Sequence, residues 1–328
     1  MPILSQPQSS KQWWSETARP QIGKAFERLR GLSSTPISLR SPLATRVGTE
    51  DRNLAEIRRL LAAGNTIDFI SSFPRSGNTW LRYLLSDILL QLAGHPTSTN
   101  LPIHPDRIIP DLYGNQLADC DRRVERAGSI FKTHEPFARL ERKLNVGQDF
   151  ASCRHIYICR NAEDALISYY HYHRRFPQLE HHTRDGADAF CEARFADWAD
   201  HIWSYLAAIA KDAPVLLVAY ELMLERPCEV LAEVLSWLGI EPEAGMIERA
   251  VQNMQFSNLQ AQEAQKPANP DEFFFRRGIK GSGELELQRS TLRRIRRQAA
   301  GLTRQADSLI AAQNVAAARH SRVLKASA

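Results

Sequence analysis

A short apolar run that leads straight into a polar turn limits most strongly what this chain can fold into. Residues 67–73, Ile-Asp-Phe-Ile-Ser-Ser-Phe, resemble a buried strand and are followed at once by Pro-Arg-Ser-Gly-Asn-Thr-Trp at 74–80. Behind the turn, apolar side chains recur at helical spacing, at Leu81, Leu84, Leu85, Ile88 and Leu89. The pattern predicts a strand, a tight turn and the start of a helix.

The turn itself predicts a phosphate-binding site. A strand that turns tightly into a helix directs backbone N–H groups and the positive end of the helix toward one point. Gly77 allows the backbone to come close to a ligand, Ser76 and Thr79 can add hydroxyl donors, and Arg75 adds a fixed positive charge. The alternative interpretation is an ordinary capped helix after a strand, where Ser and Asn are also common.

Four short runs are predicted to be buried strands of one sheet: residues 67–73, 129–132, 155–159 and 214–220. A helix is predicted to begin near Pro227 and end at Gly239, with Val230, Leu231, Val234, Leu235 and Leu238 on one face. Strands that alternate with helices indicate a single α/β domain with a central, mainly parallel sheet flanked by helices. A ligand is then expected across the carboxyl ends of the strands.

The chain divides, by its composition, into three parts. Residues 1–60 are expected to be a partly disordered N-terminal extension, because residues 33–48 are rich in Ser, Thr and Pro. Residues 61–300 are expected to form the α/β domain, and residues 301–328 a helical C-terminal tail. Within the domain, segments 95–128, 177–200 and 240–275 lack a regular pattern, so we expect them to be irregular loops around a second substrate.

Cysteine usage and hydropathy favour a soluble protein of the cytoplasm. The five cysteines include no Cys-x-x-Cys pair, and their odd number fits reduced thiols better than a disulfide framework. Arg82, Asp87 and Gln91 interrupt the most apolar stretch, residues 81–92, so no membrane span is expected. The net charge is only +5, yet arginines crowd between residues 289 and 304, which fits either a polyanion contact or a solvated helix face.

Two alternative functions can be considered for a chain with a phosphate-binding turn and a C-terminal group of arginines. A nucleotide-dependent phosphotransferase of the P-loop type would need Gly-x-x-x-x-Gly-Lys-Ser/Thr and a carboxylate at a strand end to help hold magnesium, and neither is found. Arg75, Lys132 and Arg160 lie at or just after three of the strand ends, and Glu221 follows the fourth. A ligand's charge would therefore be met mainly by cationic side chains and backbone amides, so no metal is expected. A non-catalytic polyanion-binding module that uses the C-terminal arginines is the second alternative.

Four motifs, in the same order, resemble those of the cytosolic-type sulfotransferases. They are Phe-Pro-Arg-Ser-Gly-Asn-Thr-Trp at 73–80, Lys-Thr-His-Glu-Pro at 132–136, Arg160 with Ser168 eight residues later, and Arg-Arg-Gly-Ile-Lys-Gly at 276–281. The resemblance covers roughly residues 65–290. Three features depart from the family pattern: Ala162 replaces a proline, Ser-Gly-Glu follows Gly281 where Asp-Trp-Lys is usual, and no clear C-terminal dimerisation motif is found. Dimerisation through that motif is therefore not predicted.

The resemblance implies a P-loop-like sulfotransferase fold and transfer of a sulfuryl group from 3′-phosphoadenosine-5′-phosphosulfate (PAPS) to an acceptor hydroxyl or amine. His134 would be the general base, and Arg75 and Lys132 would stabilise the charge that develops on the departing phosphate. Donor-binding positions would be Arg75, Ser76, Gly77, Asn78, Thr79, Trp80, Arg160, Ser168, Tyr220, Phe256, Arg276, Arg277 and Gly278. The partner would be a small-molecule, glycan or lipid acceptor, and not a nucleic acid.

Overall fold

A parallel four-stranded sheet forms the centre of the computed structural model, which describes residues 47–96, 98–101, 103–114, 119–264, 275 and 277–326. The strands are β1 (Asp68–Ser72), β2 (Ile130–Thr133), β3 (Arg154–Cys159) and β4 (Val215–Ala219), in the spatial order β2-β1-β3-β4. Every neighbouring pair is parallel. The predicted α/β class, the mainly parallel sheet and the four strand positions are confirmed.

The order of the strands creates the place where a ligand can bind. After β1 the chain moves to β2 on one side, and after β3 it moves to β4 on the other side. Connections that leave neighbouring strands in opposite directions open a crevice beyond the carboxyl ends of those strands. The crevice of this sheet therefore lies at the ends of β1 and β3.

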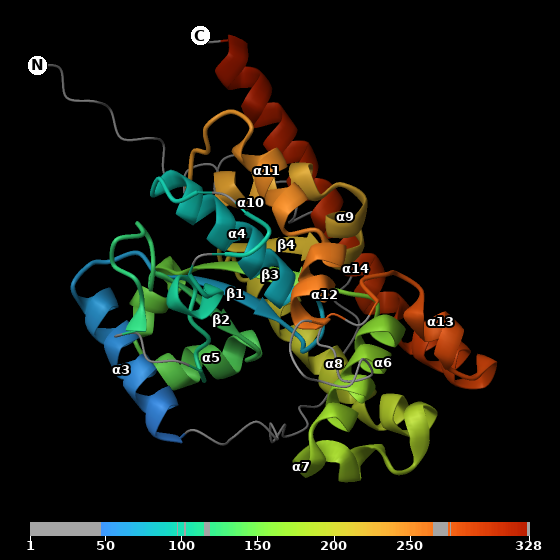
Figure 1. Ribbon diagram of the computed structural model, residues 1–328. Helices are drawn as coiled ribbons and strands as arrows, with labels where there is room; N and C mark the ends of the chain where they lie inside the picture. The colour runs from blue at the N-terminus through green and yellow to red at the C-terminus, as the bar shows by residue number, and fades with distance from the viewer. Residues whose placement is uncertain are drawn as a thin grey trace, which may run out of the picture.

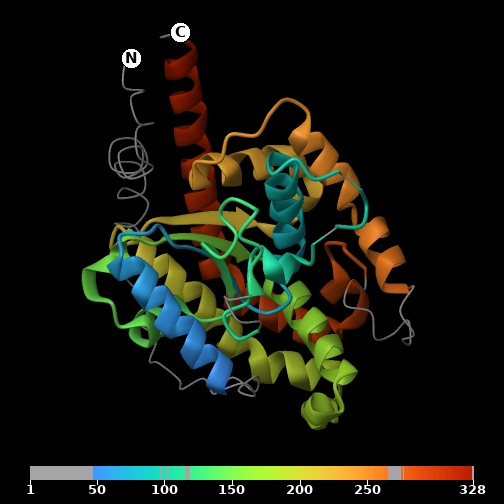
Figure 2. The ribbon, with the colours of Figure 1, turned by 60° about the vertical axis from the view of Figure 1, so that its left-hand side comes forward.

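Helices cover both faces of the sheet (Figures 1 and 2). On one face lie α4 (Asn78–Leu92), α10 (Pro227–Leu238) and α11 (Met246–Asn253). On the other face lie α5 (Phe137–Leu144) and α8 (Gly186–Ile209), with α6 (Ala162–Arg175) packed against α8. The predicted helix from Pro227 to Gly239 is confirmed, since Pro227 is the first residue of α10 and Gly239 ends it in the left-handed conformation, with φ of 64°.

The remaining elements are short helices and two long ones at the ends of the described chain. The helices are α3 (Val47–Ala62), α7 (Pro177–Glu180), α9 (Tyr220–Glu225), α12 (Phe256–Ala264), α13 (Ser282–Glu286) and α14 (Arg289–Ala326). Within the described residues, 3₁₀ turns also span Pro105–Arg107, Gly147–Ser152 and His181–Thr183. None of the helices in these ranges combines the length and the hydrophobicity that a membrane span requires.

Helix α3 belongs to the packed part of the chain. Leu54, Ile57 and Leu61 are buried in one cluster with Leu140 and Leu144 of α5. The expected limit of the domain, between residues 60 and 61, falls inside α3, and the folded part extends N-terminally to include this helix. Residues 1–46, most of the expected N-terminal extension, lie outside the described residues.

Helix α14 is continuous across the expected limit between residues 300 and 301. It buries Ile295 and Leu309, and in Figure 2 it runs past the sheet as one long helix toward the C-terminus. The side chain of Gln313 accepts a hydrogen bond from Leu217 N at 3.1 Å and donates one to Val215 O at 2.9 Å. This side chain satisfies backbone groups on the outer edge of β4, which would otherwise be open to pairing with another strand.

Segments 177–200 and 240–275 are more regular than the sequence indicated, and that prediction was wrong for α8, α11 and α12. The first half of α8, residues 186–197, carries few large apolar side chains, and within it only Phe190 and Cys191 are buried. The helix is stabilised by packing against α6 and α14, which a pattern within one segment does not reveal. The described residues of segment 95–128 are mostly irregular, with a 3₁₀ turn at 105–107 and an isolated parallel bridge between Asp111 and Lys132.

Candidate active site

The turn between β1 and α4 adopts a conformation that depends on glycine. Gly77 has φ of 102°, and a Cβ added there would lie 2.5 Å from Cδ2 of Tyr220. The turn is therefore packed directly against the residue that follows β4. Arg75, two residues earlier, has φ of 69°, which is uncommon for a residue with a side chain and occurs preferentially at functional sites.

The guanidinium of Arg75 lies among side chains of α6. Its Nε donates to Ser168 Oγ at 3.3 Å, and its Cζ lies 5.5 Å from the ring centre of Tyr172. Burial, and then the positive charge of Arg160, lower the pKa of Arg75 to about 10, so the group stays cationic at neutral pH. Two of the predicted donor-binding residues, Arg75 and Ser168, are thus in direct contact.

Arg160, at the end of β3, connects three of the motifs. It donates from Nη1 to Arg75 O at 2.9 Å and from Nη2 to Ile279 O at 3.2 Å, and its guanidinium lies 4.3 Å from the ring centre of Tyr220. Its Nε is buried and has no hydrogen-bond partner among the described residues, and the same is true of Ser76 Oγ in the turn. Two buried donors that lack partners indicate a place for an external acceptor.

The segment that contains Gly278 closes against the same cluster. Gly278 has φ of 60°, and a Cβ there would lie 2.4 Å from the Phe256 ring, so the backbone rests on that ring. Asp164 of α6 accepts hydrogen bonds from Gly281 N at 2.7 Å and Gly283 N at 2.8 Å. These contacts hold residues 278–283 beside α6.

Two other predicted donor-binding residues, Trp80 and Arg277, have less direct positions. The Trp80 indole is almost fully buried, donates to Met254 O at 2.8 Å and meets the Tyr220 ring edge-on at 6.5 Å. Arg277 forms an ion pair with Glu286 at 3.2 Å. Arg276 lies outside the described residues.

His134 follows β2, next to the end of β1. Its Nδ1 lies 2.8 Å from Ser72 O, so Nδ1 carries the proton and donates, which leaves the lone pair on Nε2. Its own carbonyl oxygen lies 3.0 Å from Nε2 of His201. Burial, and then the positive charge of Lys132, lower the pKa of His134 to about 3. The imidazole is therefore neutral at physiological pH, the form that can accept a proton.

Lys132, two residues before His134, forms an ion pair with Asp111. Burial alone would raise the pKa of Asp111, but the charges of Lys132 and Arg82 hold it below its usual range, so the carboxyl is ionised. The residues predicted to be catalytic are therefore divided into two contact groups: Lys132 lies with His134 and Asp111, and Arg75 lies with Ser168 and Arg160.

Comparison with known proteins decides the family. The family described as Sulfotransferase domain matches residues 68–303, a range that includes all the described residues of the candidate active site. The chain belongs to the sulfotransferase domain family. The predicted resemblance, and with it a sulfuryl-transferring enzyme, is confirmed.

Relatives and solved structures agree with this assignment. The sulfotransferase is 27% identical over 234 residues to a flavonol 3-sulfotransferase of Flaveria bidentis, covering 65% of this chain and 74% of that protein. It is 26% identical over 238 residues to cytosolic sulfotransferase 6 of Arabidopsis thaliana, covering 65% and 70%.

Among solved structures, its fold matches mouse sulfotransferase SULT7A1 complexed with PAP, with a TM-score of 0.55, 20% identity and coverage of 76% of this chain and 88% of that chain. It also matches retinol dehydratase in complex with androsterone and inactive cofactor PAP, with a TM-score of 0.52, 16% identity and coverage of 76% and 85%. At these identities the likeness shows the fold alone.

Acidic side chains also help to build the site, and the roles of Asp111 and Asp164 were not predicted from the sequence. Asp111 comes from an irregular segment that offered no pattern. Asp164 lies inside the 160–168 motif, and Glu221, which accepts a hydrogen bond from Asn161 N at 3.1 Å, follows Tyr220 directly. The position of Asp164 within a motif was the available signal for its role.

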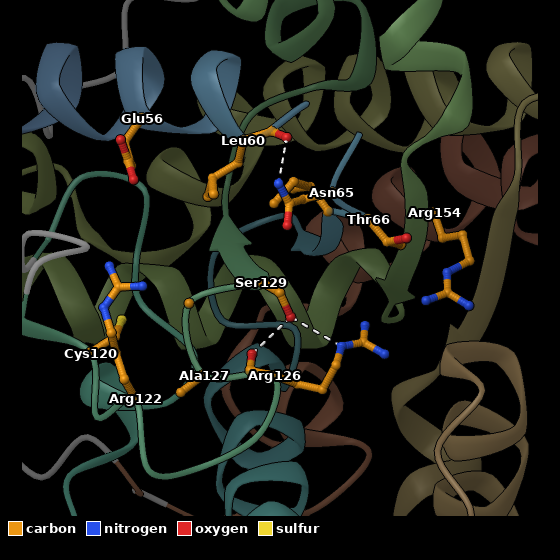
Figure 3. A pocket seen from close by; sticks show the side chains of 12 residues that line it. Glu56, Leu60, Asn65, Thr66, Cys120, Arg122, Arg126, Ala127, Ser129 and Arg154 are labelled. Carbon is orange, nitrogen blue, oxygen red and sulfur yellow. Dashed lines mark hydrogen bonds between the residues drawn. The ribbon is translucent and has the colours of Figure 1, made fainter. Parts of the chain in front are cut away.

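A pocket of about 410 Å³ lies at the amino-terminal ends of the strands, on the side of the sheet opposite to the candidate active site (Figure 3). Thr66 and Ser129, which precede β1 and β2, line it together with Arg126 and Arg154. Both of these arginines form ion pairs with the one buried carboxylate of Asp68. The pocket lies away from the carboxyl ends of the strands and does not form part of the candidate active site.

Proposed function

We propose that this sulfotransferase uses PAPS as its sulfuryl donor. The observation that carries the proposal is that four sequence-distant segments meet at the carboxyl ends of β1 and β3. Arg75 contacts Ser168, Arg160 reaches both residue 75 and residue 279, and Gly278 rests on Phe256. Two guanidinium groups close together, with buried donors beside them, favour an anionic ligand. The PAP complexes among the solved relatives support the same class of nucleotide.

The contacts suggest a division of roles among the donor-binding residues. Ser76, Gly77, Asn78 and Thr79 would bind the 5′-phosphosulfate at the start of α4, where backbone N–H groups and the helix dipole favour negative charge. Arg160, Ser168, Arg277 and Gly278, with Arg276, would bind the 3′-phosphate. Tyr220, Phe256 and Trp80 would surround the adenine.

His134 would act as the general base of the transfer. As an acceptor O–H or N–H attacks the sulfur, Nε2 would take its proton, a new bond to sulfur would form, and the bond from sulfur to the 5′-phosphate oxygen would break. The products would be the sulfated acceptor and adenosine 3′,5′-bisphosphate. The hydrogen bond from Nδ1 to Ser72 O supports this role, because it fixes the tautomer with the lone pair on Nε2.

Lys132 and Arg75 would stabilise the negative charge that grows on the departing phosphate oxygen. Cations positioned for that charge bind the transition state more strongly than the ground state. We infer that these side chains take the place of a metal, so that no metal is required.

The acceptor is proposed to be a small molecule, with glycan or lipid hydroxyls as further classes. Relatives named for flavonol sulfation make phenols the first class to test. A cytoplasmic location is proposed from the relatives named as cytosolic and from the five cysteines, all of which are free thiols. No nucleic-acid partner is proposed, since Arg294 and Arg296 of α14 pair with Glu192 and Glu163.

The test is to incubate the protein with PAPS and panels of phenols, alcohols, amines, glycans and lipids, and to search by mass spectrometry for the gain of one SO₃. Transfer by the wild type is expected. His134→Ala should lower kcat by about 100-fold or more while the Kd for adenosine 3′,5′-bisphosphate, measured by calorimetry, changes little. Arg277→Ala should do the reverse: it should raise the Kd for adenosine 3′,5′-bisphosphate more than it lowers kcat.

The rival activity is tested with the same protein. Phosphoryl transfer from ATP that depends on magnesium, without any SO₃ gain from PAPS, would overturn the proposal in favour of a phosphotransferase. Full turnover by His134→Ala would show that His134 is not the general base, and it would not affect the assignment of PAPS as the donor.

A further inference from the structure

The ion pair between Lys132 and Asp111 is built into the backbone on both sides. Residues 110–112 lie along the free edge of β2, where Asp111 forms an isolated parallel bridge with Lys132. Lys132 N donates to Pro110 O at 2.9 Å, and Leu112 N donates to Lys132 O at 2.9 Å. The two charged residues are thus placed opposite each other by main-chain hydrogen bonds, before any attraction between their side chains.

The segment that carries Asp111 is itself anchored to the helix of the phosphate-binding turn. Arg82 of α4 donates to Ile109 O from Nε at 3.1 Å and from Nη2 at 2.7 Å, and it forms an ion pair with Asp106. At Asp111, Oδ1 accepts a hydrogen bond from Tyr113 N at 3.1 Å, and Oδ2 contacts the Lys132 ammonium. Both oxygens therefore have fixed partners, and the carboxylate cannot rotate without breaking one of them.

A lysine side chain needs a fixed partner to keep its ammonium in one position. The side chain has a flexible four-carbon stem and an ammonium with three donors, so it does not hold one geometry by itself. Only 12% of the Lys132 side chain and 22% of the Asp111 side chain are exposed, so water screens the pair weakly. One N–H bound to Asp111 leaves two N–H groups for an anion beside His134.

We propose that Asp111 is a positioning residue of the sulfuryl transfer, which holds the Lys132 ammonium in place beside His134. The proposal rests on the role proposed above for Lys132. Asp111 acts through Lys132 and does not itself touch donor or acceptor. Its contribution is the orientation of the cation that meets the developing charge, where a displacement of about 1 Å is enough to slow a reaction strongly.

The first experiment replaces the charge and keeps the shape. Asp111→Asn is expected to lower kcat about 10-fold, because the ammonium loses its charged partner, while KM for PAPS and Kd for adenosine 3′,5′-bisphosphate stay within about two-fold. Asp106→Asn is the matched control: Asp106 lies on the same segment and contacts Arg82 instead of Lys132. It should lower the melting temperature without a specific loss in kcat.

The decisive experiment is a double-mutant cycle with Lys132→Met. If Asp111 acts through Lys132, Asp111→Asn causes no further loss of kcat in the Lys132→Met protein, and it can raise kcat by removing a buried carboxylate that has lost its partner. A 10-fold loss that persists in the Lys132→Met background overturns the proposal. Asp111→Glu, which keeps the charge on a longer stem, gives the same cycle if the Asn variant unfolds.

The wild-type assay separates this proposal from the proposed function. Absence of SO₃ transfer from PAPS by the wild-type enzyme means that the donor assignment has failed. Transfer by the wild type together with additive effects of Asp111→Asn and Lys132→Met means that only the positioning role has failed.

Discussion

His134 shows how a single residue obtains its chemistry from its contacts. The sequence provides an imidazole whose pKa in water lies near 6.5 and whose two nitrogens are equivalent candidates for the proton. The hydrogen bond to Ser72 O assigns the proton to Nδ1, and burial together with Lys132 lowers the pKa to about 3. The result is a neutral imidazole over the whole physiological range of pH.

Histidine NMR of the ligand-free protein tests this state directly. With ¹³C- and ¹⁵N-labelled histidine, the signal that disappears in His134→Ala should show the tautomer protonated on Nδ1 and should not titrate between about pH 7.5 and about pH 5.5. A His134 signal with a midpoint near pH 6.5 would contradict the predicted state, because it would mean that the charged imidazole is tolerated in the site.

At the scale of elements, the turn between β1 and α4 depends on one glycine for two separate reasons. Gly77 has a positive φ, which costs any other residue about 1 kcal/mol or more. It also has no room for a Cβ, because the Tyr220 ring lies 2.5 Å from where that atom would be. Gly77 therefore provides both the left-handed backbone that precedes α4 and the close approach of the Tyr220 ring.

Two alanine substitutions separate these reasons. Gly64→Ala, at φ of 78° with nothing within 4 Å of the added atom, should lower the free energy of unfolding by about 1 kcal/mol. Gly77→Ala should lower it by about 2 kcal/mol more and also weaken binding of adenosine 3′,5′-bisphosphate, since Tyr220 or the turn must move. Urea denaturation and calorimetry measure both effects, and equal losses in the two variants would argue against the clash.

At the scale of the whole molecule, buried histidines link stability to pH. His155 of β3 lies in the core among Phe69, Phe137 and Phe150, and burial lowers its pKa to about 3. Burial also lowers the pKa of His201 to about 4. Below about pH 6.5 the unfolded chain takes up protons that the folded protein does not, so the stability present at neutral pH is lost as pH falls.

The expected slope is about 1.4 kcal/mol per pH unit for each such histidine once the pH is well below 6.5. His155→Phe keeps an aromatic ring in an aromatic cluster and removes one of these groups. Whatever the substitution does at pH 7, urea denaturation between about pH 6 and about pH 5 should show a shallower loss of stability than in the wild type. An unchanged slope would mean that His155 is not neutral in the fold.

Much of the fold and part of the site could be predicted from residues that act locally. The four strands were predicted because strands buried on both faces need continuous apolar runs, and the phosphate-binding turn because a polar segment with a glycine stands directly between a buried strand and a helix. Helix α8 could not be predicted in this way, since its sparse first half is stabilised by α6 and α14 and not by its own pattern.

The sequence by itself determined the family, the parallel sheet and the identity of the cationic residues, because these depend on local pattern and on motif order. Only the tertiary structure decided which charges meet: that Arg75 lies with Arg160 and Ser168, and that Lys132 is held by Asp111. The physical reason is that burial and pairing determine how strongly a charged group interacts with its surroundings. Both depend on segments that are far apart in the chain and come together at the carboxyl ends of the strands.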